Sequence, residues 1–217
     1  MNEKPKHDME HYFAASPKAP AKLGIIRTNL RGMSFEFLTA SSVFSKKQVD
    51  IGTRLLIEAM ALPETGAVLD VGCGYGAVGI TVAASNPRLH VVMTDLNERA
   101  FRLAKQNTRK NKASNAEVRC GYLYEPVKEL RFNCVLSNPP VSAGMETVKA
   151  LITQAPTVMA QNASFQMVIR SKIGAKTLPH IFTETFGNYQ VLARKSGYRV
   201  LIAEKHRSTS AQRFNST

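Results

Sequence analysis

The chain has 217 residues, of which 44% are hydrophobic and 21% charged, and its 29 Lys and Arg against 16 Asp and Glu give a net charge of +13. This length suits one α/β domain with a full core, and the composition is that of a soluble globular protein. The sequence has no apolar run near the roughly 20 residues that span a bilayer. The polar start lacks the apolar core of a signal peptide, so we expect a cytoplasmic protein.

The excess of positive charge favours a polyanionic partner, RNA or a ribonucleoprotein, over a basic surface that serves only solubility. Cys73, Cys120 and Cys134 have no metal-ligand spacing. We therefore expect no metal site and three buried free thiols in a reducing compartment.

The first sixty residues predict an extension that precedes the main fold. Residues 1–22 show no periodicity and are expected to form a loose arm. Residues 25–29 and 33–37 predict a β-hairpin around Arg31-Gly32, because apolar and polar side chains alternate in the second run. Residues 50–61 have the apolar spacing of a helix, and Pro63 lies just past its end.

Strands and helices then alternate. Strands are expected at residues 67–71, 89–94, 116–120, 132–137, 164–170, 189–194 and 198–204, and helices at 77–85, 98–110, 145–160 and 176–186. This order predicts a Rossmann-like, doubly wound α/β fold with a mostly parallel seven-stranded sheet and an antiparallel C-terminal edge. We expect one domain over residues 23–205, with the hairpin and helix at 23–62 and the core at 63–205, followed by a basic tail at 206–217.

The expected helix at residues 98–110 carries a basic stripe. Its cations lie three to four residues apart, which places them on one face: Arg99, Arg102, Lys105 and Arg109. An RNA track is one interpretation, but a solvated outer face is favoured because this helix should cover the sheet away from the Asn-Pro-Pro loop at residues 138–140. Its inner face would be Ala100, Leu103, Ala104 and Asn107.

A glycine turn follows the first core strand, in the order Val68-Leu69-Asp70-Val71-Gly72-Cys73-Gly74-Tyr75-Gly76. Gly72, Gly74 and Gly76 let the backbone turn sharply and approach a ligand closely. Together with Gly79 the pattern also fits a dinucleotide fingerprint, so the glycines alone do not identify the ligand. Asp70 separates the two interpretations, because a carboxylate there can bind the ammonium of S-adenosylmethionine but would repel a pyrophosphate.

The second core strand ends at Asp95, where an acid accepts hydrogen bonds from ribose hydroxyls. Leu96 and Cys73 belong to the same predicted cofactor site. Asn97 either assists Asp95 or caps the next helix, and the two roles are equally compatible with its position. The third strand should deliver an acid or amide for the adenine amino group, and the residue in that place is Tyr122.

Ser137-Asn138-Pro139-Pro140 follows the fourth strand and has the form of the loop that binds planar amines in S-adenosylmethionine methyltransferases. An exocyclic aromatic amine is a poor nucleophile and needs two acceptors for its N–H groups. The Asn138 side-chain oxygen and the Pro139 carbonyl fit that role, while Pro139 and Pro140 stiffen the loop. Val141 follows, where enzymes acting on adenine N6 or a glutamine amide usually place an aromatic ring.

These motifs and two further segments carry a resemblance over most of the chain. The segments are Ser42-Val43-Phe44-Ser45-Lys46-Lys47-Gln48-Val49-Asp50-Ile51-Gly52-Thr53-Arg54-Leu55-Leu56 and Ile169-Arg170-Ser171-Lys172-Ile173-Gly174-Ala175. The sequence is similar to the small-subunit ribosomal RNA (guanine-N2) methyltransferases, in their single-domain prokaryotic form, the methyltransferase small domain. The resemblance implies a class I fold, S-adenosylmethionine as cofactor with S-adenosylhomocysteine as product, and 16S ribosomal RNA or the small ribosomal subunit as partner.

The resemblance also implies roles for residues outside the two loops. Phe44, Ser45 and Asp50 would lie over the cofactor, although Phe44 could be a core ring. Lys46, Lys47, Arg170 and Lys172 would lie near the RNA backbone, and for the lysines a solvated surface is an equal alternative. Tyr122 and the absence of basic residues at 141–145 depart from the family pattern.

The predicted function is therefore methyl transfer to the exocyclic N2 amine of a guanine in RNA. A glutamine-N5 or other nucleobase-amine methyltransferase is the first alternative, although Val141 and the basic charge argue against a protein substrate. A non-catalytic module that binds S-adenosylmethionine or RNA is the second, kept open by Tyr122 and Met145. Asp70 and the Asn138 loop argue against an NAD-dependent enzyme.

Overall fold

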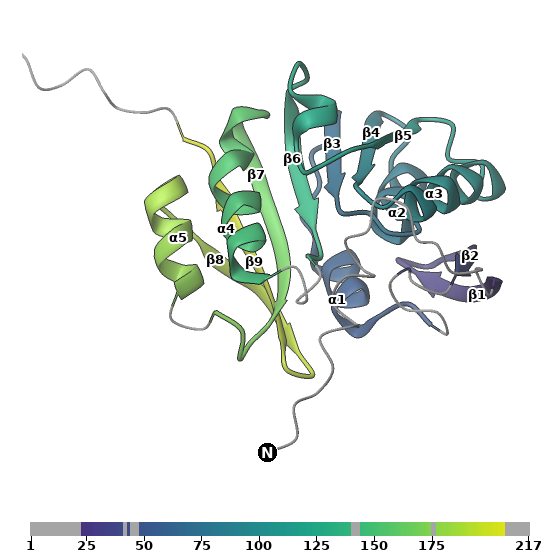
Figure 1. Ribbon diagram of the computed structural model, residues 1–217, viewed down its shortest axis with the longest axis horizontal. Helices are drawn as coiled ribbons and strands as arrows, with labels where there is room; N and C mark the ends of the chain where they lie inside the picture. The colour runs from purple at the N-terminus through teal and green to yellow at the C-terminus, as the bar shows by residue number, and fades with distance from the viewer. Residues whose placement is uncertain (1–22, 41–42, 44–47, 140–143, 175–176, 207–217) are drawn as a thin grey trace, which may run out of the picture.

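The computed structural model describes residues 23–40, 43, 48–139, 144–174 and 177–206. Its centre is a seven-stranded sheet with the order β5-β4-β3-β6-β7-β9-β8 (Figure 1). The strands are β3 (Gly66–Val71), β4 (Leu89–Asp95), β5 (Ala116–Cys120), β6 (Phe132–Ser137), β7 (Met159–Arg170), β8 (Gln190–Lys195) and β9 (Tyr198–Glu204). Strands β3 to β7 pair in parallel, whereas β9 is antiparallel to both β7 and β8. This confirms the predicted fold class.

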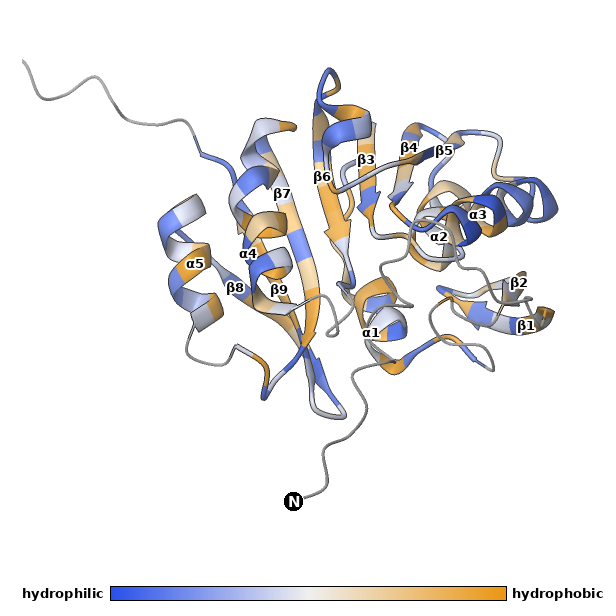
Figure 2. Cartoon of the chain, viewed as in Figure 1, coloured by the Kyte–Doolittle hydropathy of each residue, from blue (hydrophilic) through white to orange (hydrophobic). Residues whose placement is uncertain are grey.

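Helices cover both faces of the sheet, which is why its strands are nearly continuous apolar runs. One buried cluster joins the sheet to α1 (Ile51–Ala59), α2 (Ala77–Ser85) and α3 (Glu98–Lys110), and the other joins it to α4 (Gly144–Gln154) and α5 (Thr177–Phe186). Neighbouring residues of one strand belong to different clusters: Val68 belongs to the first cluster and Leu69 to the second. Figure 2 shows β3 and β6 largely orange and α3 largely blue.

The predicted N-terminal hairpin is present as β1 (Leu23–Leu30) and β2 (Met33–Ala40), which form a separate antiparallel pair. Arg31 and Gly32 have positive φ angles of 48° and 76°, as a tight two-residue hairpin turn requires.

Asn107 of α3 attaches this hairpin to the rest of the fold. Its fully buried side chain exchanges hydrogen bonds of 2.7 and 2.9 Å with the Leu38 backbone of β2, in the manner of a neighbouring strand. The same amide nitrogen donates to the Tyr75 carbonyl at 2.8 Å. One side chain therefore connects the hairpin, α3 and the glycine turn.

The predicted inner face of the helix at 98–110 is confirmed, since its buried residues are Ala100, Leu103, Ala104 and Asn107. Two predictions were wrong. The helix expected at 145–160 ends at Gln154, and after the 3-10 turn η4 (Ala155–Thr157) the chain enters β7 at Met159. Pro156 explains the early end, because it has no N–H to donate within a helix. Of the three thiols expected to be buried, Cys134 is buried, Cys73 is half-buried, and Cys120 is exposed because it ends the edge strand β5.

The predicted arm at 1–22 and residues 207–217 of the predicted tail lie outside the described residues. Among the helices of the described ranges, none is long and apolar enough to cross a membrane.

Candidate functional site

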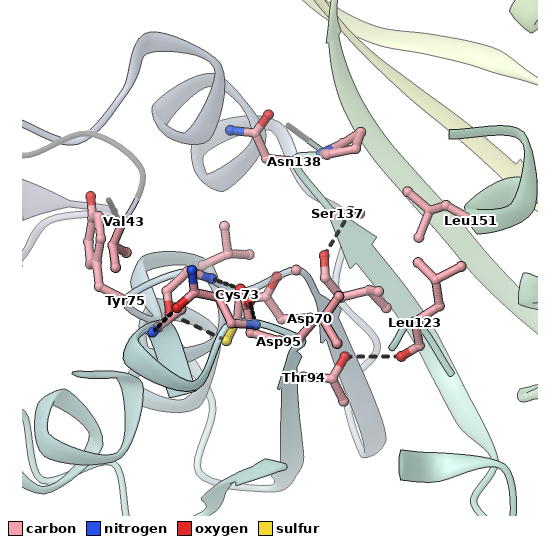
Figure 3. Close-up of a pocket in the computed structure, with 18 of the residues that line it drawn as sticks. Val43, Asp70, Cys73, Tyr75, Thr94, Asp95, Leu123, Ser137, Asn138 and Leu151 are labelled. Carbon is pink, nitrogen blue, oxygen red and sulfur yellow. Dashed lines mark hydrogen bonds between the residues drawn. The ribbon is translucent and has the colours of Figure 1, made fainter. Parts of the chain in front are cut away.

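A pocket opens at the carboxyl ends of β3, β4 and β6, and its walls come from the loops that follow these strands and β5, with further side chains from α1 and α4 (Figure 3). Ten of the predicted site residues line it: Asp70, Gly72, Cys73, Gly74, Asp95, Leu96, Asn97, Tyr122, Asn138 and Pro139. Gly76 caps α2 and Asp50 caps α1 at its border. The predicted residues Phe44, Ser45, Lys46, Lys47, Pro140 and Val141 lie outside the described residues.

The glycine turn is shaped by its backbone. The N–H groups of Gly72 and Cys73 both donate to the Thr94 carbonyl, at 2.8 and 3.0 Å, so the turn is fastened to the end of β4. Gly72, Gly74 and Gly76 have φ angles of 72°, 59° and 94°. A Cβ on Gly72 or Gly74 would meet nothing within 4 Å, so the backbone conformation, and not crowding, requires glycine at these two positions.

Gly79 has a different reason to be glycine. A Cβ there would lie 2.4 Å from Cγ of Met93 and 3.3 Å from Oδ2 of Asp70. The missing side chain lets α2 lie directly against β3 and β4, and the Gly79 N–H then donates to Asp70 Oδ2 at 2.9 Å. The close approach of this helix thus fixes one of the two carboxylates in the pocket.

The carboxylates of Asp70, which is buried, and Asp95, which is half-buried, carry raised pKa values. Burial raises the pKa of Asp70, which is 1% exposed, to about 7, and the nearby charge of Asp95 adds to this effect. Burial also raises the pKa of Asp95 to about 6, although its two oxygens accept the N–H groups of Gly74 and Asn97, each at 2.8 Å. In the described part of the chain no Lys or Arg forms an ion pair with either group, so this pocket favours a ligand that brings positive charge.

Asn138 is held from behind by the first turn of α1. Its Nδ2 donates to Thr53 Oγ1 at 2.8 Å and to Asp50 Oδ2 at 3.3 Å. The same Asp50 oxygen accepts the Thr53 N–H at 3.0 Å and so caps the helix. Because both N–H groups of the amide point to α1, its oxygen is the group left to accept from a substrate. Among the described residues, none donates to that oxygen.

Figure 3 separates the pocket into two ends. Asp70, Cys73 and Asp95 gather around the glycine turn, whereas Asn138 lies apart from them, beyond Ser137. The Ser137 hydroxyl donates to the Val71 carbonyl at 2.8 Å and ties the ends of β6 and β3 together. The arrangement can hold a cationic ligand at one end and present a fixed hydrogen-bond acceptor at the other.

Asn97 and Tyr124 have structural roles. The Asn97 side chain accepts the N–H groups of Arg99 and Ala100, at 2.9 and 3.2 Å, so it caps α3 while also lining the pocket. Tyr124 is 4% exposed, and its hydroxyl donates to the Leu151 carbonyl at 2.6 Å, which makes it a core ring.

Arg170 and Lys172 lie outside the pocket but at the same edge of the sheet. Both are exposed, and Arg170 ends β7, the strand next to β6. The Arg170 guanidinium lies over the Tyr198 ring, 5.4 Å from its centre, and its Nε donates to the Tyr198 hydroxyl at 3.0 Å.

The sequence did not identify Thr53 and Tyr75 as site residues. Thr53 reaches Asn138 across 85 positions of sequence, and no local spacing signals that contact. Tyr75 lines the pocket and packs against Phe37 with ring centres 5.5 Å apart. Its position inside the glycine turn was the available signal of a site residue, but an aromatic ring at that position is equally compatible with the core.

A family model described as the methyltransferase small domain matches residues 34–202. YbxB of Bacillus subtilis, an uncharacterized protein, is 34% identical over 198 residues, which cover 90% of this chain and 98% of that one. Ribosomal RNA small subunit methyltransferase C of Haemophilus influenzae strain Rd is 32% identical, with 88% of this chain and 58% of that one covered. The same enzyme of Hamiltonella defensa is 31% identical, with 76% and 49% covered. The chain thus spans about half the length of these two enzymes.

Solved structures give the same grouping. A T. thermophilus 16S rRNA N2 guanine methyltransferase, RsmC, in complex with AdoMet and guanosine, superposes with a TM-score of 0.77 at 26% identity and covers 88% of this chain and 52% of that one. A ribosomal protein L11 methylase of Lactobacillus delbrueckii has a TM-score of 0.58 at 19% identity over 72% of this chain and 76% of that one, a likeness of fold alone.

Proposed function

The chain belongs to the methyltransferase small domain family, and from that premise we propose that it transfers a methyl group from S-adenosylmethionine to the exocyclic N2 amine of a guanine in 16S ribosomal RNA. Relatives at 31% and 32% identity are named for the small-subunit RNA, and the superposed T. thermophilus enzyme carries AdoMet and guanosine. The net charge of +13 supports an RNA partner, and we expect the protein to work in the cytoplasm.

The glycine-turn end of the pocket fits S-adenosylmethionine. This cofactor supplies a methyl group on a positively charged sulfur, and its methionine part adds an ammonium. The carboxylates of Asp70 and Asp95, which have no cationic partner among the described residues, suit such a ligand. Asp70 would hold the ammonium and Asp95 the ribose hydroxyls. The open space over Gly72 and Gly74 lets a ligand approach the backbone, and Tyr122, which lines the pocket, would contact the adenine.

The observation that carries the proposal is the pair of hydrogen bonds from the Asn138 amide to Thr53 and Asp50, here called the clamp on Asn138. With its Nδ2 held by Thr53 and Asp50, the side-chain oxygen is oriented before any substrate arrives. That oxygen and the Pro139 carbonyl would accept the two N–H groups of the amine and favour a pyramidal nitrogen with an available lone pair. The amine then needs no strong base before attack, and its proton can leave to water. Preorganised groups of this kind contribute on the order of 3 kcal/mol to lowering a barrier.

The test is methyl transfer from labelled S-adenosylmethionine to ribosomal RNA and small subunits from cells that lack this protein, followed by nucleoside analysis. Asn138→Ala serves as the matched control, because it removes the acceptor and leaves the carboxylates of the cofactor end in place. Label in N2-methylguanosine that disappears with Asn138→Ala would support the proposal.

The other outcomes identify the alternatives. Label in methyladenosine or in protein would keep the methyltransferase and replace the substrate. Tight binding of S-adenosylmethionine without transfer to RNA or protein would indicate a binding module and contradict the proposed activity.

A further inference from the structure

Cations surround the turn of the β8–β9 hairpin, at the edge of the sheet where the pocket opens. Five residues form this group, here called the basic rim: Arg170, Lys172, Arg194, Lys195 and Arg199. The Ser171 N–H donates to the Gly197 carbonyl at 2.8 Å, so the loop after β7 is fastened to the hairpin turn. Figure 1 shows this turn, in yellow, at the same edge of the sheet as the end of β7.

The strand register arranges these cations in two rows. In the first, Tyr198 of β9 is opposite Arg170 of β7 and Lys195 of β8. In the second, Arg199 is directly opposite Arg194. Opposed side chains of antiparallel strands share a face, so Arg194 and Arg199 are like charges placed side by side, a pairing that destabilises a sheet.

No carboxylate compensates this charge: within the described ranges, none forms an ion pair with any residue of the basic rim. The Nε and Nη2 atoms of Arg199 are buried and have no hydrogen-bond partner among the described residues. An unpaired buried donor costs stability. By contrast, Arg102 on the basic stripe of α3 pairs with Glu98 at 3.3 Å, and Lys105 lies over the Phe101 ring at 5.3 Å.

The basic rim is joined to the acceptor end of the pocket by direct packing. The Tyr198 ring lies so close to Gly52 that a Cβ on this glycine would be 2.9 Å from Cε1 of the ring. Gly52 belongs to the first turn of α1, the turn whose Asp50 and Thr53 hold Asn138. Tyr198 lies in the first row, so a polyanion bound by Arg170 and Lys195 would pass beside the acceptor, whereas Arg194 and Arg199 lie on the opposite face of the strands at the same turn.

We propose that the basic rim binds the phosphate backbone of the RNA strand that carries the target guanine and orients that strand toward Asn138. The inference rests on the proposed function, and it assigns the β8–β9 turn, through Arg194, Lys195 and Arg199, as the part of the protein that positions the substrate. Arg170 is already fixed by Tyr198, so it loses little side-chain freedom on binding a phosphate.

The experiment compares two double variants with equal charge change. Arg194→Gln with Lys195→Gln removes two positive charges from the hairpin turn, and Lys105→Gln with Arg109→Gln removes two from the exposed face of α3. RNA binding is measured over a range of salt concentrations, separately from methyl transfer and from binding of S-adenosylmethionine.

For the hairpin variant we expect the KM for RNA to rise about tenfold with kcat and cofactor affinity unchanged. The slope of log K against log salt should flatten by roughly 0.7–0.9 for each phosphate that the variant no longer neutralises. The α3 variant should behave as wild type. Equal RNA affinity and slope in the hairpin variant and wild type would overturn this inference, as would equal losses in both variants, which would indicate net charge alone.

The outcomes also separate this inference from the proposed function. Wild type that methylates RNA together with an unaffected hairpin variant would overturn only the role of the basic rim. Salt-dependent RNA binding that requires Arg194 and Lys195, in a wild type that transfers no methyl group to RNA, would uphold the rim and overturn the proposed activity.

Discussion

The two ends of the pocket are built by different means. At the glycine-turn end, backbone N–H groups hold the functional side chains: Gly79 binds Asp70, and Gly74 and Asn97 bind Asp95. At the other end, side chains of α1 hold Asn138 across more than 80 positions of sequence. The first end concentrates negative charge under burial, whereas the second presents a neutral amide oxygen.

This difference predicts which changes should impair each end of the pocket. Backbone N–H groups survive most substitutions, so the glycine-turn end should respond to changes in backbone space and to pH. The amide clamp depends on two side chains, so the acceptor end should lose catalytic rate when either is changed, with little effect on cofactor binding.

The largest effect is expected for Asn138→Ala. Removing the preorganised acceptor should lower kcat by about a hundredfold to a thousandfold, because such groups act mainly in the transition state. Binding of S-adenosylmethionine, measured by calorimetry, should change little, since Asp70 and Asp95 remain. A comparable loss of cofactor affinity would show that the two ends are not independent.

Gly79→Ala tests the backbone of the glycine-turn end. The new Cβ would collide with Met93, so we expect a loss of about 1–3 kcal/mol in the free energy of unfolding, measured with urea. The second arm of the test is the same change in a Met93→Ala background, where the collision partner is absent. There Gly79→Ala should cost far less. An equal cost in both backgrounds would mean that contact with Met93 is not the cause.

Asp70 predicts the pH dependence of cofactor affinity. With the pKa of Asp70 raised to about 7, protonation below that pH removes the negative charge that would bind an ammonium. Affinity for S-adenosylmethionine should therefore fall as the pH drops through 7, approaching about tenfold per pH unit. Asp70→Asn should bind S-adenosylmethionine weakly, and its affinity should not change near pH 7. Asp95, with a pKa of about 6, should cause a second loss of affinity at lower pH.

The same shift has a consequence for the stability of the ligand-free protein. The native state binds a proton at Asp70 at higher pH than the unfolded chain does, because the native pKa is raised from 3.8 to about 7. The Asp70 contribution to the free energy of unfolding therefore falls as the pH rises from about 4 to 7. Asp70→Asn should remove this contribution, and urea unfolding of both proteins across that range would measure it. If the free energy of unfolding of Asp70→Asn changed with pH in the same direction and by the same amount, the change would belong to another titrating group.

The sequence predicted most of the fold because the signals are local. Periodicity, glycine turns and capping residues lie within the elements they define, and the bounds of α2, α3, β5 and β6 agree with those predicted. The exception, the end of α4, was missed because an apolar helical spacing continued past Pro156 into a buried strand. The glycine-turn end was predictable for the same reason, since Asp70 and Asp95 occupy fixed places in a strand-turn-helix unit.

The acceptor end was predictable only in part. Asn138 and Pro139 could be placed because a short loop at the end of a parallel strand must reach the ligand edge of the sheet. The contact of Asn138 with Thr53 could not, because it depends on how α1 packs across β7, β8 and β9. Sequence separation, more than chemistry, decided which parts of this site could be predicted.

Thr53→Val gives the smallest and most specific effect. Valine keeps the shape of threonine but removes the oxygen that accepts from Asn138, so the amide would lose a hydrogen bond of about 1 kcal/mol and its fixed orientation. We expect kcat to fall about fivefold with cofactor affinity nearly unchanged. The decisive comparison is Thr53→Val in the Asn138→Ala background. If Thr53 acts by holding Asn138, it should have no further effect on kcat there, because the group it orients is gone. An equal loss in both backgrounds would instead place Thr53 in direct contact with the substrate or cofactor, and the clamp would no longer explain how the acceptor end works.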